Sequence, residues 1–112
     1  MQSNANTLEE EVTAVTSLNR IKEELARSVR YLNDLKYELT NDMSVEQGEK
    51  SRVRIQIESL LIDLNEQVYT TSEALANAFS SRKPSPSELT KAAQVIEQRK
   101  IYLMGKLKQC IV

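Results

Sequence analysis

Hydrophobic residues recur along the first forty positions at a spacing that is typical of a long helix packed against a neighbour. They are about 3.4 residues apart on average, close to the 3.5-residue period of supercoiled helices. The series consists of Leu8, Val12, Val15, Leu18, Ile21, Leu25, Val29, Leu32, Leu35 and Leu39. Thr7 and Glu10 have the spacing of a capping box. We therefore expect a helix over about residues 8–40, after a disordered tail at residues 1–7.

A second series predicts a helix over about residues 45–80. Its members are Val53, Ile57, Leu60, Leu61, Leu64, Val68, Leu75 and Phe79. Ser44 and Gln47 have the spacing of another capping box, although Gly48 follows directly.

The third helix, predicted over about residues 86–110, has the clearest start in the chain. Ser85 is suited to the N-cap, Pro86 to the first helical position and Glu88 to the third. The predicted buried face is Leu89, Ala93, Ile96, Leu103, Leu107 and Ile111, with Lys100 interrupting the heptad. Short connections make such long helices antiparallel. We predict an all-α protein: one domain over residues 8–112, folded as an elongated antiparallel three-helix bundle with coiled-coil-like packing.

The second helix carries apolar residues on a further face. Ile55, Ile62 and Tyr69 repeat every seven residues, and on a helical wheel they point about 120–160° away from its main series. We call them the isoleucine–tyrosine stripe. Two interpretations stay open: the third helix packs on the stripe, or the stripe is a docking face for another helix or a second copy. With the polar residues beside it, the predicted binding set is Ile55, Ile62, Tyr69, Arg54, Glu58 and Asn65.

Composition disfavours catalysis and several kinds of ligand. The chain has no His, a single cysteine (Cys110) and no Gly-rich phosphate loop, so we expect no enzyme, no metal and no cofactor. The adjacent carboxylates of Glu23 and Glu24 are better explained as solvated helix-face residues than as a catalytic pair. Fifteen basic and sixteen acidic residues are interspersed, which disfavours nucleic acid as a partner. No apolar run is long enough for a membrane span.

Two families of co-chaperones resemble parts of this pattern. Arg99 and Lys100 followed by Leu103 and Leu107 resemble the third helix of BAG domains. The layout of three long helices is similar to that of the tubulin-folding cofactor A family. The resemblance implies binding to other proteins, and no functional residue is transferred from either family.

The leading functional hypothesis is a non-enzymatic, protein-binding helical bundle. It would act in the cytosol or nucleus as an adaptor, a small co-chaperone or a subunit of a larger helical assembly. The alternative is a structural coiled-coil protein that associates with itself as a homodimer or filament.

Overall fold

The computed structural model contains three long α-helices. They are α1 (Ser3–Asn41), α2 (Gln47–Ala78) and α3 (Pro86–Ile111). The structure describes the backbone of residues 3–81 and 84–111, and the side chains of residues 8–81 and 84–109. Within these ranges there is no strand, so the predicted all-α class is confirmed.

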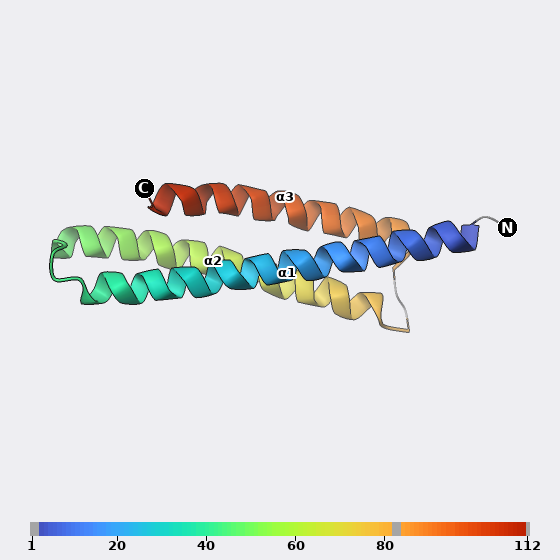
Figure 1. The fold of residues 1–112 in the computed structure, drawn as a ribbon, viewed down its shortest axis with the longest axis horizontal. Helices are drawn as coiled ribbons and strands as arrows, with labels where there is room; N and C mark the ends of the chain where they lie inside the picture. Colours follow the sequence, from blue (N-terminus) through green and yellow to red (C-terminus); the bar gives the residue numbers. More distant parts are fainter. Residues whose placement is uncertain (1–2, 82–83, 112) are drawn as a thin grey trace.

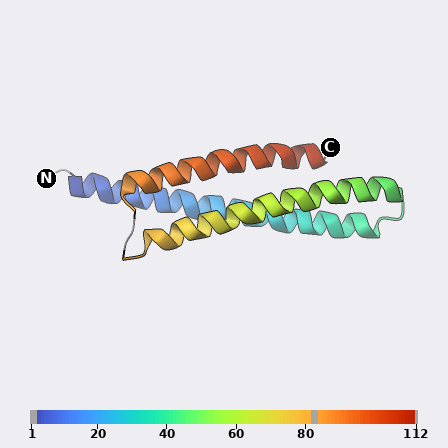
Figure 2. The same cartoon turned by 180° about the vertical axis from the view of Figure 1, so that it is seen from behind.

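The helices run up, down and up, so each is antiparallel to the next (Figure 1). The Cα trace measures 67 × 23 × 15 Å along its principal axes, which makes the bundle a rod. Seen from either side, α3 stops short of the connection between α1 and α2, while the start of α1 extends beyond both other helices (Figures 1 and 2). All three pairs of helices pack against each other. The predicted elongated three-helix bundle is confirmed.

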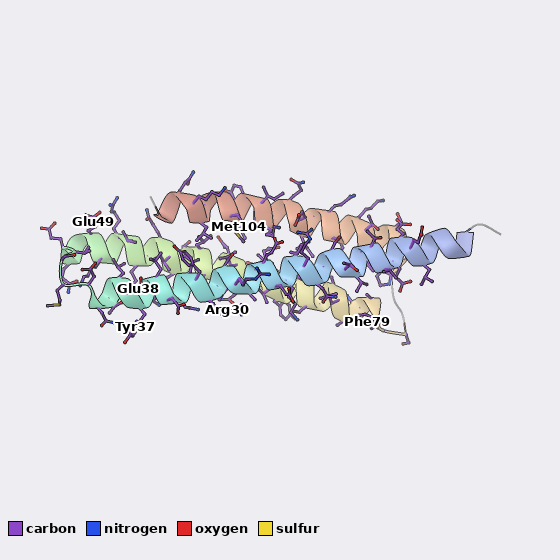
Figure 3. All side chains as sticks on the ribbon, in the orientation of Figure 1. Arg30, Tyr37, Glu38, Glu49, Phe79 and Met104 are labelled. Atoms are coloured by element: carbon purple, nitrogen blue, oxygen red, sulfur yellow. The ribbon has the colours of Figure 1, made fainter. Side chains whose placement is uncertain are left out.

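The core is built almost entirely from aliphatic side chains of the three predicted series. Its fully buried large apolar members are Leu18, Ile21, Leu25, Leu32, Ile57, Leu64 and Leu103. Leucine and isoleucine recurring near every 3.5 residues keep one stripe of each helix turned toward the other two, so the core continues along the rod. Met104 also lies on the side of α3 that faces the other helices (Figure 3), with its sulfur 3.4 Å from the hydroxyl oxygen of Ser28.

The caps predicted from the sequence form at only some of the helix ends. At α3 the prediction is confirmed, because the backbone N–H of Glu88 donates to the Ser85 hydroxyl oxygen at 3.2 Å. At α2 the predicted box does not form. The helix begins at Gln47, and Glu46 precedes it without a side-chain cap. The hydroxyl of Ser44 instead donates to Asp42 at 2.6 Å.

The start of α1 also differs from the prediction. The helix begins at Ser3, so Thr7 lies inside it and cannot be its N-cap. The predicted disordered tail is therefore helical from Ser3 onward, and its first two residues lie outside the described part of the chain. Neither Gly nor Pro, the two strongest helix breakers, occurs in residues 3–7.

Among the described side chains, three residues of the predicted series are exposed instead of buried. The side chain of Ile111, predicted to be buried, lies outside the described residues. Leu8 and Val12 are 62% and 56% exposed. The start of α1 extends beyond both other helices (Figure 1), and α1 already contacts α3 at Glu10, which accepts a hydrogen bond from the Thr90 hydroxyl at 3.3 Å. The extension therefore accounts for the exposure of Leu8 but not for that of Val12.

Phe79 is 77% exposed. It is the C-cap of α2, where the helical backbone ends, so its side chain no longer follows the spacing of the core positions. Figure 3 places it at that end of the bundle.

Candidate functional site

The isoleucine–tyrosine stripe is exposed to solvent. Ile55, Ile62 and Tyr69 are 64%, 68% and 68% exposed. They lie on the side of α2 opposite its buried residues, such as Ile57, Leu64 and Leu75. Neither α1 nor α3 covers this side, so the interpretation in which α3 packs on the stripe is wrong. The angle between the two faces of α2 was visible in the sequence, but the position of α3 around α2 was not.

The polar residues predicted beside the stripe do not form one group. The Glu58 carboxylate lies 3.1 Å from the ammonium nitrogen of Lys36 on α1 and 3.7 Å from the Arg54 guanidinium on α2. This ion pair ties one edge of the face to α1. Asn65 is exposed, and its side-chain amide makes no hydrogen bond with any residue that the structure describes. Its amide is therefore available to a partner.

The other edge of the face borders the groove between α2 and α3. A shallow cavity of about 390 Å³ lies there, with Ile55, Asp63 and Lys106 among its lining residues. Ile55 thus belongs both to the stripe and to the rim of this groove. The exposed apolar surface is a helix face with an adjoining depression, which is the shape that a helical segment can pack on.

Farther along the same groove, α3 exposes a short apolar pair that the sequence analysis did not identify. Val95 and Tyr102 are 69% and 53% exposed, and both line a shallow depression between α2 and α3. Two cations lie over the Tyr102 ring, with the Arg99 guanidinium carbon 5.6 Å and the Lys106 nitrogen 4.9 Å from its centroid. Val95 and Tyr102 are seven residues apart, as are neighbouring residues of the stripe. That spacing is the sequence signal by which the pair could have been identified.

An ion cluster occupies the interface between α1 and α3. The side chain of Lys100 is only 9% exposed, and its ammonium group contacts the carboxylates of Glu24 and Glu97. The Arg20 guanidinium lies 3.1 Å from Glu24 and 3.3 Å from Glu97. Two cations and two carboxylates therefore balance each other where the heptad pattern of α3 is interrupted.

The electrostatics of this cluster favour its charged form. The hydrogen bond from Lys100 lowers the pKa of the Glu24 carboxyl, and the bond from Arg20 acts in the same direction. Burial lowers the pKa of Lys100, but the hydrogen bonds to Glu24 and Glu97 outweigh it and the net shift is upward. A carboxylate held ionised in this way is poorly suited to act as a general acid. Glu23, the other half of the considered pair, is exposed and lies 3.8 Å from Arg27.

The described residues give no support for a metal site or a membrane span. No three His, Cys, Asp or Glu side chains among them come together as metal ligands would. None of their helices is long and apolar enough to cross a membrane. The side chain of Cys110 lies outside the described residues.

Comparison of the chain with protein-family models, curated proteins and solved structures finds no match. The two co-chaperone families that resemble its helical pattern are therefore not supported as relatives. The function has to be argued from the surface of the bundle itself.

Proposed function

We propose that this chain is a non-enzymatic protein-binding module whose docking surface is the outer face of α2. It would serve as an adaptor, a small co-chaperone or a subunit of a larger helical assembly. The observation that carries the proposal is the exposure of Ile55, Ile62 and Tyr69, each by about two thirds, at strict heptad spacing on a helix whose core residues already face the other way.

Heptad spacing matters because it keeps apolar side chains aligned along one side of a helix that winds around a partner. Single exposed apolar residues are ordinary on protein surfaces, but a regular row on one helix is characteristic of an interface. With two thirds of each side chain available, burial of each one would contribute roughly 1–2 kcal/mol to association. Three such residues provide a meaningful part of a moderate affinity.

The non-enzymatic part of the proposal rests on the surroundings of the ionisable groups. Histidine, the commonest general base, does not occur in the chain. The partly buried carboxylates of Glu24 and Glu97 are paired with Lys100 and Arg20. Such pairing satisfies a bundle interface, whereas a catalytic group needs a free lone pair or proton near a substrate cavity.

Affinity purification from the native cells with three forms of the chain tests the proposal. The wild type is compared with Ile62→Glu/Tyr69→Glu, which places two charges on the stripe. The matched control is Tyr37→Glu/Ile101→Glu. It changes one isoleucine and one tyrosine that are also exposed but lie on α1 and α3, and Tyr37 points away from the bundle (Figure 3).

We expect the stripe variant to lose the proteins that co-purify with the wild type, while the control keeps them. Circular dichroism and thermal unfolding establish that both variants are folded. Equal recovery of the same partners by all three forms would refute the docking surface, as would a stripe variant that fails to fold.

A further inference from the structure

Charge changes sign along α2. Its basic residues are Lys50, Arg52 and Arg54, all in the first third of the helix. Beyond Arg54 the helix contains no basic residue, and its ionisable side chains are Glu58, Asp63, Glu66, Glu73 and Tyr69. The isoleucine–tyrosine stripe spans the change, with Ile55 beside the basic part and Tyr69 in the acidic part.

We infer that the occupant of this face is the same face of a second copy, packed antiparallel with Ile62 on the two-fold axis. The inference rests on the proposed docking surface and names its partner. An antiparallel pairing centred on Ile62 brings together residues whose numbers add to about 124. Ile62 then meets its own counterpart, and Ile55 meets Tyr69 of the other copy, so every stripe residue has an apolar neighbour.

The same register pairs the polar residues favourably. Arg52 of one copy lies opposite Glu73 of the other, and by symmetry the pair occurs twice. Both side chains are exposed, and among the described side chains the only ion pair of Arg52 is with its neighbour Glu49. On the opposite flank, the free amide of Asn65 lies opposite the Glu58 carboxylate of the other copy and can donate to it.

The parallel arrangement is disfavoured by the same residues. In register, it places the basic first third of α2 beside the same basic segment of the other copy, and the acidic remainder beside the acidic remainder, and juxtaposed like charges weaken an interface. The helices α1 and α3 lie on the other side of α2 and leave its outer face clear, so they do not prevent the antiparallel contact. The order of charges along α2 therefore favours an antiparallel second copy over a parallel one.

Sedimentation equilibrium over a wide concentration range tests the self-association. For so small an apolar contact we expect a dimer with a dissociation constant on the order of 10–100 µM, and no association of Ile62→Glu/Tyr69→Glu. Arg52→Glu alone or Glu73→Lys alone should weaken the dimer roughly three- to tenfold, because each breaks an exposed ion pair that occurs twice. The double variant Arg52→Glu/Glu73→Lys exchanges the charges and should restore the wild-type constant.

Disulfide cross-linking tests the orientation. In a Cys110→Ser background, Ile55→Cys and Tyr69→Cys are prepared separately and oxidised with copper phenanthroline, alone and mixed. The antiparallel register predicts a cross-link only in the mixture, since identical positions would lie about 21 Å apart along the axis. A cross-link of Ile55→Cys with itself would overturn the orientation.

The outcomes separate this inference from the proposed function. A wild-type chain that stays monomeric up to millimolar concentration would overturn the homodimer. If the stripe variant still loses cellular partners in that case, the docking surface stands and its occupant is a different protein. If the chain forms a dimer whose dissociation constant is unchanged by Arg52→Glu alone and by Glu73→Lys alone, the proposed register is refuted.

Discussion

The interface between α1 and α3 and the outer face of α2 depart from the usual distribution of residues in opposite ways. The first buries a lysine, Lys100, with 7% of its surface exposed, and the second exposes three large apolar side chains. The buried charge is compensated inside the molecule, since Glu24 and Glu97 contact it. The exposed apolar residues have no such compensation. The first departure is therefore explained by the fold alone, and the second is the one that our proposed docking surface would account for.

The two regions also differ in what they contribute to the isolated chain. A buried ammonium group without anions is costly to desolvate, so the carboxylates around Lys100 are essential to the stability of the bundle. The stripe residues remain hydrated in the folded chain much as they would in the unfolded chain, and their replacement should hardly affect folding. The ion cluster thus contributes to the stability of the isolated chain, whereas the stripe would contribute to association with a partner.

The largest expected effect comes from removing both carboxylates of the ion cluster. Glu24→Gln/Glu97→Gln should lower the free energy of unfolding by about 2–3 kcal/mol, less than for a fully buried pair because the carboxylates are partly hydrated. Urea denaturation followed by circular dichroism measures it. Lys100→Leu, which removes the charge and completes the heptad, should stay within about 1 kcal/mol of wild type. If it is as destabilised as the double variant, the cluster is not a compensated charge.

The second effect is a dependence of stability on pH. Because the folded-state pKa of Glu24 lies below its ordinary value of 4.5, its contribution is fully present above that value and is lost as the pH falls through the folded-state pKa. The stability difference between wild type and Glu24→Gln should therefore be constant above about pH 5.5 and shrink on acidification. Thermal unfolding from pH 2 to pH 7 checks this. A difference independent of pH would contradict it.

The sequence predicts the shared core of the three helices better than it predicts the ion cluster between α1 and α3. The heptad series and the short connections were sufficient to predict three antiparallel helices, because Leu18, Leu64 and Leu103 are buried together when neighbouring helices share one core. The interruption at Lys100 was visible too. Its partner Glu24 was not, because pairing across two helices depends on their relative rotation and axial register, which a pattern along one helix does not contain.

The residues of the candidate site could be predicted from the sequence, but their exposure to solvent could not. The positions of Ile55, Ile62 and Tyr69 follow from the heptad repeat alone. Their exposure depends on which side of α2 the third helix occupies. The failures at Thr7 and Phe79 have a related origin: capping and series patterns are local, whereas the real ends of α1 and α2 depend on where the helical backbone begins and stops.

A smaller effect is expected at Gly105 on α3, which contacts neither the ion cluster nor the stripe. A Cβ atom added there would meet no atom within 4 Å, and the glycine has no positive φ. Gly105→Ala should therefore stabilise the chain by about 0.5–1 kcal/mol through helix propensity alone. Urea denaturation of the variant and the wild type measures it. A destabilised variant would contradict the open surroundings of Gly105 in the bundle.

The most direct test of the central claim is the free energy of unfolding of Ile62→Glu/Tyr69→Glu, measured by urea denaturation at a concentration low enough to keep every form monomeric. Leu64→Ala, at a fully buried position on the same helix, serves as the sensitive control and should lose about 3 kcal/mol. We predict that the stripe variant stays within about 0.5 kcal/mol of wild type. A loss approaching that of the control would place the stripe in the core and contradict the account.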